Sequence, residues 1–141
     1  MSKPVCVVCG IGPKNGAAFA RRFSREGYAL ALLSRSTEYT SELAEELGDA
    51  KAYACDVSDE AAVKAAFDGV RADLGPVDVL VFNAGSGSWG NIEEISAADF
   101  ERGWRINALG AFLTSKQVID DMIAKEAGNI VSHPNCRLTW T

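Results

Sequence analysis

The stretch Val5-Cys6-Val7-Val8-Cys9-Gly10-Ile11-Gly12-Pro13-Lys14-Asn15-Gly16 runs from apolar residues into a glycine-rich turn. Consecutive β-compatible apolar residues predict a strand that is buried on both faces. A helical apolar face follows, made by Ala17, Ala18, Phe19, Ala20 and Phe23. Glycine lets the backbone approach a ligand closely, and the N-terminus of a helix offers N–H groups and a partial positive charge to a phosphate. The stretch therefore predicts a strand, turn and helix suited to the pyrophosphate of a dinucleotide.

The glycines of this turn are spaced G-x-G-x-x-x-G, one residue longer than the common dinucleotide fingerprint G-x-G-x-x-G. A tight turn that needs glycine only for its own geometry is therefore an alternative interpretation. The residues that the first interpretation places at the phosphates are Gly10, Gly12, Lys14, Asn15 and Gly16. Motifs elsewhere in the sequence are needed to distinguish a phosphate-binding turn from a purely structural one.

The overall composition restricts the class of protein. With 141 residues, 48% of them hydrophobic, the chain is long enough for one domain with a core and too short for two. A net charge of -5 leaves no basic stripe, so nucleic acid is not an expected partner. Apolar runs stay well below about 18 residues, and no signal sequence is recognisable, so no membrane association is expected. We expect a cytoplasmic protein.

Cys6 and Cys9 form a C-x-x-C pair, which raises the question of a redox or zinc site. Residues three apart in a strand point to opposite faces and lie about 10 Å apart, too far for a disulfide. Zinc would need two further ligands, and Cys55, Cys136 and His133 do not have the spacing of a zinc motif. We therefore expect buried thiols and no metal site.

A second apolar run, Tyr28 to Leu33, ends in Ser34-Arg35-Ser36. In dinucleotide-binding folds an acidic residue at this place accepts a hydrogen bond from the ribose 2′-hydroxyl, whereas a nearby arginine accommodates a 2′-phosphate. Ser34 stands where the acid would stand and Arg35 follows it, so NADP is favoured over NAD. The alternative is a solvated arginine at the end of a strand.

Further strands and helices alternate along the chain. Strands are expected at 50–55, 77–82 and 128–131, and helices at 38–47, from a Ser58 cap to Leu74, and from a capping box at Ser96 with an Ile95–Phe100 staple. The last helix is expected to have one apolar face formed by Phe100, Trp104, Asn107, Ala111, Phe112, Val118, Ile119, Met122 and Ile123. This order predicts an α/β fold with a doubly wound parallel sheet of about five strands in three layers.

At this point the chain resembles the short-chain dehydrogenase/reductase family over residues 3–131. The glycine turn matches that family's G-x-x-x-G-x-G motif through Gly10 and Gly16, with Lys14 in place of the middle glycine. The resemblance implies a Rossmann dinucleotide-binding domain at residues 1–131, truncated relative to the family, and an atypical tail at 132–141.

Three more motifs carry the resemblance. Asp56-Val57 resembles the pair that contacts the adenine ring, Asn83-Ala84-Gly85 matches the N-A-G motif that lines the cofactor, and Asn107 resembles the asparagine of the catalytic tetrad. Each has a structural alternative: Asp56 could cap the next helix, Asn83 could form a turn, and Asn107 could be a satisfied polar residue within a helix. Their occurrence together at matching places favours the family.

Family members transfer hydride between a nicotinamide and a carbonyl or alcohol, with a tyrosine as general acid/base and a lysine four residues later. None of Tyr28, Tyr39 and Tyr53 has such a lysine, and Ser132 comes too early in the strand to match the family's serine. Without the acid/base, transfer loses a factor of roughly 10² to 10⁴. We expect the NADP(H)-binding part of a reductase that is inactive alone. The tail suggests the frameshifted or truncated product of a longer gene.

Two other functions are alternatives. A non-catalytic nucleotide-binding or interaction module is the main alternative, while a flavodoxin-like regulator would leave Arg35 and the Asn83-Ala84-Gly85 motif unexplained. The helix from Ser96 resembles one at the family's dimer interface, so a homo-oligomer is expected. The substrate, beyond a small carbonyl or alcohol, is not specified by these residues.

Overall fold

The computed structural model describes residues 2–133, which form one parallel five-stranded sheet in the order β3-β2-β1-β4-β5. In chain order the elements are β1 (Val5–Cys9), α1 (Asn15–Arg25), β2 (Ala29–Ser34), α2 (Glu38–Leu47), β3 (Ala50–Ala54), α3 (Glu60–Asp73), β4 (Val79–Phe82), α4 (Ala97–Trp104), the π-helical segment η1 (Arg105–Leu109), α5 (Gly110–Lys125) and β5 (Asn129–Ser132). The predicted doubly wound α/β fold is confirmed. The expectation that residues 132–141 are an atypical tail, produced by a frameshift or truncation, concerns mostly residues 134–141, which lie outside the described residues.

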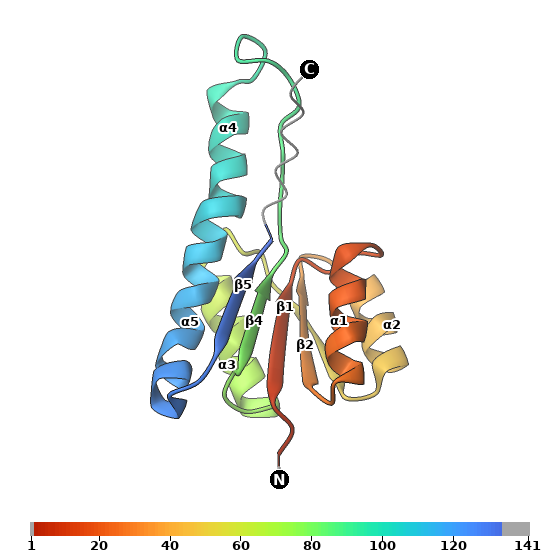
Figure 1. The fold of residues 1–141 in the computed structure, drawn as a ribbon. Helices are drawn as coiled ribbons and strands as arrows, with labels where there is room; N and C mark the ends of the chain where they lie inside the picture. The colour runs from red at the N-terminus through yellow and green to blue at the C-terminus, as the bar shows by residue number, and fades with distance from the viewer. Residues whose placement is uncertain (1, 134–141) are drawn as a thin grey trace.

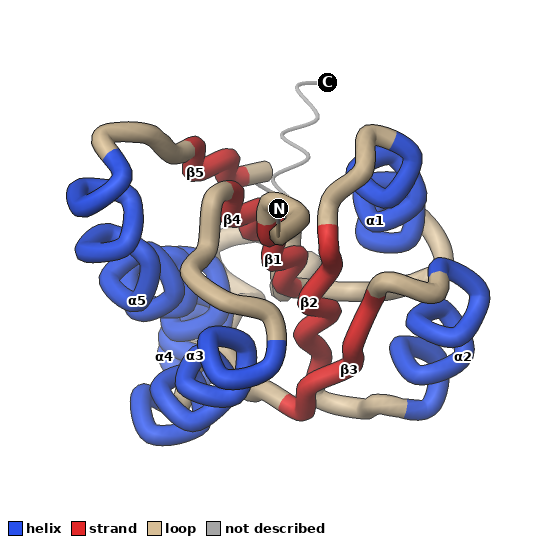
Figure 2. The backbone as a smooth tube through the Cα atoms, turned by 90° about the horizontal axis from the view of Figure 1, so that it is seen from below, coloured by secondary structure: helices blue, strands red, loops and turns tan. Residues whose placement is uncertain are grey.

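Two helical layers cover the sheet: α1 and α2 lie on one face, and α3 and α5 on the other (Figures 1 and 2). Side chains of β1 alternate between two cores, because successive strand residues point to opposite faces. Cys9 joins Phe67 of α3 and Val118 of α5, whereas Cys6 joins Ala17 of α1 and Leu43 of α2. The two thiols are therefore in opposite layers and unpaired, as expected, and burial raises the pKa of Cys6 to about 12.

The long helix predicted from Ser96 is present as α4, η1 and α5 in continuous succession (Figure 1). Its Ser96 cap is confirmed, because the Ser96 hydroxyl accepts a hydrogen bond from the Asp99 N–H at 3.1 Å. The prediction of one apolar face is wrong. Val118 and Met122 are buried against the sheet, while Phe100, Trp104, Phe112, Ile119 and Ile123 are exposed.

The division lies within α5. Val118 and Met122 are one turn apart and pack in the core beneath the helix, whereas Ile119 and Ile123, the next residues along the chain, are exposed. Phe112, Ile119 and Ile123 therefore form a second apolar side of the helix, which the sheet does not cover.

The predicted Ser58 cap of α3 is also wrong. Asp59 is the N-cap, and its carboxylate accepts hydrogen bonds from the N–H groups of Ala61 and Ala62. Ser58 instead donates from both its N–H and its hydroxyl to the Asp56 carboxylate, at 3.0 and 2.7 Å. Aspartate is as good an N-cap as serine, so the aspartate next in the chain takes the role.

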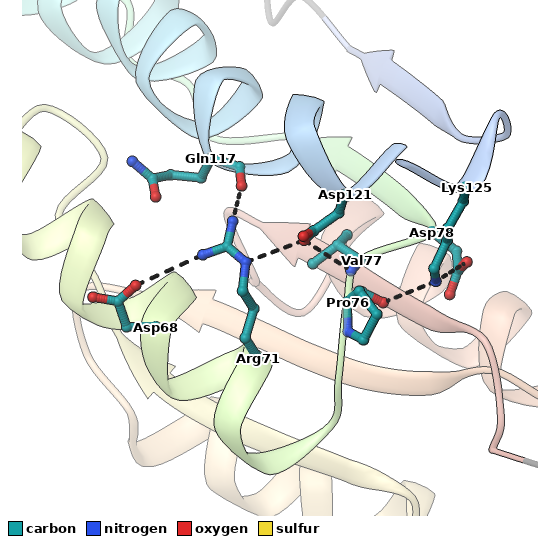
Figure 3. Close-up of polar contacts among 8 residues, drawn as sticks. All are labelled: Asp68, Arg71, Pro76, Val77, Asp78, Gln117, Asp121 and Lys125. Atoms are coloured by element: carbon teal, nitrogen blue, oxygen red, sulfur yellow. Dashed lines mark hydrogen bonds and ion pairs between the residues drawn. The ribbon is translucent and has the colours of Figure 1, made fainter. Parts of the chain in front are cut away.

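Polar contacts fix α5 at the amino ends of the strands (Figure 3). The Asp121 carboxylate of α5 accepts from Arg71 Nε of α3 at 3.1 Å and from the Val77 N–H before β4 at 3.3 Å. Lys125 Nζ, at the end of α5, lies 2.6 Å from the Asp78 carboxylate. These contacts tie α5 to α3 and to the start of β4.

Candidate functional site

An open cleft of about 1040 Å³ lies at the carboxyl ends of the strands. Its walls include every residue that the sequence predicts at the cofactor: Gly10, Gly12, Lys14, Asn15, Gly16, Ser34, Arg35, Asp56, Val57, Asn83, Ala84 and Gly85. These residues follow or end β1, β2, β3 and β4, so four loops meet around one space. In an open α/β sheet the crevice outside the carboxyl ends, where the strand order reverses, is where ligands bind.

Gly10 is required by the protein's own packing. Its φ is +86°, and a Cβ there would lie 2.4 Å from the backbone N of Ala84. The Asn83 side-chain amide donates to the Gly10 carbonyl at 2.9 Å, so the loops after β1 and β4 are joined at this point. A Cβ on Gly16 would likewise lie 2.5 Å from the Gly10 carbonyl oxygen. Packing within the protein therefore requires glycine at these two positions, whereas cofactor contact at them stays a prediction.

Gly12 is different. A Cβ at this position would meet no heavy atom of the described structure within 4 Å, although Gly12 lines the cleft. The side chain that glycine lacks would therefore enter the open space. No side chain caps the start of α1 after Lys14, which leaves the first N–H groups of that helix to a ligand. An anionic group fits this part of the cleft.

Among residues 2–133, three cationic side chains line the cleft, Lys14, Arg35 and Arg102, against a single acid, Asp56. Two hydrogen bonds from Ser58 and the charge of Arg35 hold the pKa of Asp56 below its usual value, so this carboxyl is ionised. At the end of β2 the Ser34 hydroxyl contacts the Ser36 carbonyl and lies 3.1 Å from Thr40 Oγ1. The position that an acid would occupy in an NAD site therefore holds a neutral hydroxyl.

Asn107 lies outside the cleft, in η1, and bonds to the loop after β4. Its Oδ1 accepts from the Ser86 N–H at 3.1 Å, and its Nδ2 donates to the Ser86 carbonyl at 2.6 Å. The Asn107 side chain therefore forms its hydrogen bonds outside its own helix. The alternative interpretation, a polar residue satisfied within the helix, does not describe these contacts. Asn107 lines a second cavity of about 440 Å³, and its predicted catalytic role stays a prediction.

Sequence reasoning missed part of both walls. The cleft is also lined by Ile11, Pro13, Leu33, Ser36, Tyr39, Cys55, Ser86, Arg102 and Ile106. Most of these are chain neighbours of predicted residues, whereas Arg102 and Ile106 come from α4 and η1 and depend on how those segments stand above the sheet. Ser132 and His133, discounted from the sequence, line the second cavity beside Asn107.

The described part of the chain contains no candidate metal site and no candidate membrane-spanning helix. Among residues 2–133, no group of three histidine, cysteine, aspartate or glutamate side chains is placed to hold a metal ion. Over the same residues, none of the helices combines the length and the hydrophobicity needed to cross a membrane.

Comparison with known proteins gives consistent matches. The family described as short chain dehydrogenase matches residues 4–133. D-threitol dehydrogenase of Mycolicibacterium smegmatis is 35% identical over 91% of this chain and 51% of its own length. An actinorhodin polyketide ketoreductase with NADPH superposes with a TM-score of 0.88 at 30% identity, covering 94% of this chain and 54% of that one. An NAD⁺-bound xylitol dehydrogenase superposes with a TM-score of 0.86 at 36% identity, covering 93% and 52%. The chain spans about half the length of the curated relatives it matches.

Proposed function

The chain belongs to the short chain dehydrogenase family of oxidoreductases, and on that premise we propose that it binds NADP(H) in the cleft at the carboxyl ends of β1 to β4. The observation that carries the proposal is the convergence of all twelve predicted cofactor residues on one space. Bound NADP(H) supplies or accepts a hydride at its nicotinamide ring. The chain's own contribution is to bind and orient that cofactor.

The pyrophosphate would be held by the turn before α1. Gly12 leaves room for it, the N–H groups at the start of α1 are available, and Lys14 and Asn15 line the same wall. Gly10 and Gly16 support this site indirectly, because their missing side chains let the turn pack against Ala84 and against itself.

Preference for NADP(H) over NAD(H) would come from Arg35. A guanidinium pairs well with a phosphate, and the neutral Ser34 adds no repulsion. Structures similar to this chain contain either NADPH or NAD⁺, so the preference rests on these two residues and on the absence of an acid at the end of β2.

The reaction of the whole protein would be hydride transfer between the nicotinamide and a carbonyl or alcohol. None of the tyrosines of this sequence, Tyr28, Tyr39 and Tyr53, is followed by a lysine four residues later. We therefore propose that these 141 residues bind cofactor without turning it over by themselves. A cytoplasmic location fits this chemistry and remains part of the proposal.

Self-association through α4 and α5 is the remaining part of the proposal. Phe100, Trp104 and Phe112 are between about half and three-quarters exposed, and Ile119 and Ile123 extend the apolar surface along α5. Exposed apolar groups of this size mark interaction surfaces. Light scattering should detect a dimer or larger assembly, which Phe112→Asp weakens; a monodisperse monomer at all concentrations would contradict this part.

The test of cofactor binding is a titration of the purified chain with NADPH and with NADH, followed by nicotinamide fluorescence. A charge-assisted contact contributes about 1.5–3 kcal/mol, so NADPH should bind roughly 10- to 150-fold more tightly than NADH. Arg35→Ala should abolish that difference. Arg22→Ala is the matched control, because Arg22 is exposed on α1 and pairs with Glu26 outside the cleft. Equal affinities in the unmodified chain would refute the NADP assignment.

A further inference from the structure

The second cavity lies beside the cofactor cleft and shares Ala84 and Ser86 with it. It is formed between the loop after β4, helix α4 and the end of β5. Its volume of about 440 Å³ is within the range of about 300–1,000 Å³ that small-molecule sites have. A ligand held here would lie next to the proposed cofactor.

The wall of this cavity is dominated by large apolar side chains. Phe82 comes from β4, Ile95 precedes the α4 cap, and Phe100 and Trp104 come from α4 itself. Aromatic side chains present wide flat surfaces that pack against rings and long apolar groups. Hydroxyl groups of a ligand that lie against Phe82, Ile95 and Phe100 would find no hydrogen-bond partner in those side chains.

Charge on the wall does not favour an anion. No lysine or arginine is among the described residues that line this cavity, and Asp99 is its acid. The Asp99 carboxylate is engaged by the Ser96 hydroxyl at 2.7 Å and by Arg102, and these contacts, the Ser96 bond foremost, lower its pKa. An ionised carboxylate would repel a carboxylate or phosphate on a ligand.

Three polar side chains on the wall, those of Ser88, Asp99 and Asn107, are already bonded within the protein. The oxygen and the nitrogen of the Asn107 amide are both bonded to the Ser86 backbone. Ser88 Oγ donates to the Asp99 carbonyl at 3.3 Å. Ser132 and His133 stand at the end of β5 and supply a hydroxyl and an imidazole. One carbonyl oxygen needs one donor, which either of these can provide, whereas a polyol needs several.

From this wall we infer that the substrate class of the site is an uncharged, largely apolar carbonyl compound bearing a ring, and not a polyol or a keto acid. The carbonyl part of this inference rests on the proposed function, since it is the group that bound NADPH would reduce. The similar proteins do not choose between the classes, because their names include D-threitol and xylitol dehydrogenases and a polyketide ketoreductase.

The experiment is calorimetric titration of the 141-residue chain, with and without NADPH, using three probes. 1-Tetralone represents an uncharged bicyclic ketone, xylulose a hydroxylated ketone and 2-oxoglutarate an anionic one. 1-Tetralone should bind at least about tenfold more tightly than either of the others, which is the scale on which apolar pockets discriminate.

Gly103 offers a variant that fills the cavity. It lies on α4, lines the cavity, and a Cβ there would have only the Ser86 carbonyl within 4 Å, at 3.8 Å. Gly103→Leu should weaken 1-tetralone binding at least about tenfold and Gly103→Ala less. Both replacements favour the helix, so circular dichroism should show it retained. Glu45→Leu is the matched control, because it adds the same side chain at an exposed position of α2 outside both cavities.

The outcomes separate this inference from the proposed function. Tighter binding of xylulose or 2-oxoglutarate, or 1-tetralone binding that Gly103→Leu leaves unchanged, would overturn the inference even where NADPH binds normally. Loss of NADPH binding alone, with 1-tetralone still bound and still sensitive to Gly103→Leu, would refute the proposed cofactor function and support the apolar site.

Discussion

Gly10→Ala should destabilise the fold, whereas Gly12→Ala should weaken NADPH binding, although both glycines lie in one turn and line one cleft. A Cβ on Gly10 would lie 2.4 Å from the Ala84 N, 2.5 Å from the Ala84 Cα and 2.7 Å from the Asn83 carbonyl carbon. All three are backbone atoms, which cannot rotate away. A Cβ on Gly12 would meet nothing within 4 Å.

The magnitude for Gly10→Ala has two parts. Holding alanine at a φ of +86° costs about 1–2 kcal/mol. Moving the loop after β4 to relieve the clash costs about 1–3 kcal/mol more, by analogy with overpacked cores. The sum is about 2–5 kcal/mol, a large share of the roughly 5–15 kcal/mol that stabilises a domain.

Urea unfolding followed by circular dichroism measures this effect. With a slope of about 2 kcal/mol per molar urea, Gly10→Ala should lower the unfolding midpoint by about 1–2.5 M. Gly12→Ala should leave the midpoint unchanged or raise the stability by up to about 1 kcal/mol, because alanine restricts the unfolded chain. Gly12→Ala should instead weaken NADPH binding at least about tenfold, since its methyl group enters the cleft.

A Gly10→Ala protein that unfolds at the same urea concentration as the unmodified chain would refute the packing argument. A Gly12→Ala protein that binds NADPH normally would show that the space at Gly12 is not used by the cofactor.

Three further predictions concern single side chains. Asp121→Ala removes the partner of Arg71 and of the Val77 N–H, and should lower the free energy of unfolding by about 1–3 kcal/mol in urea titrations; a change below about 0.5 kcal/mol would show that α5 is held by apolar packing alone. Asn107→Ala should speed hydrogen exchange of the Ser86 amide by about 2- to 12-fold, the equivalent of about 0.5–1.5 kcal/mol, and an unchanged rate would contradict the contact. The pKa of Asp56 is lowered in the folded state, first by the Ser58 hydrogen bonds, so its stabilisation is present above the unfolded value of about 3.9 and is lost as pH falls through the folded value. A carbon-13 titration of the Asp56 carboxyl that gives an ordinary pKa would contradict this.

Much of the fold could be predicted because its signals are local. Apolar runs of four to six residues, each followed by a turn and a helical pattern, produce β1, β2 and β4 whatever the tertiary details. The opposite placement of Cys6 and Cys9 follows from the period of a strand alone.

The errors arose where several local solutions compete. Ser58 and Asp59 are both good caps, and only the turn that Asp56 forms with Ser58 decides between them. On α5 the buried Val118 and Met122 stand next to the exposed Ile119 and Ile123, and apolar character alone does not separate the two pairs.

The predictable part of the site is formed by residues at the carboxyl ends of strands, whose place follows from the order of the strands in the chain. Residues that end parallel strands meet at one edge of the sheet, which is why the twelve predicted cofactor residues share a cleft. Arg102, Ile106 and the second cavity depend on the angle at which α4 and η1 stand above the sheet. Their position involves contacts between residues distant in sequence, among them those of Asn107 with Ser86.

The central claim is that the cleft binds NADP(H), and amide chemical-shift mapping tests it most directly. Titrating the isotope-labelled chain with NADPH should shift the amides of residues 10–16, 34–35, 56–57 and 83–85 together, with one dissociation constant. Arg22 and the other residues on the outer side of α1 should not respond. Shifts confined to some other surface, or no shifts at all at millimolar NADPH, would contradict the account.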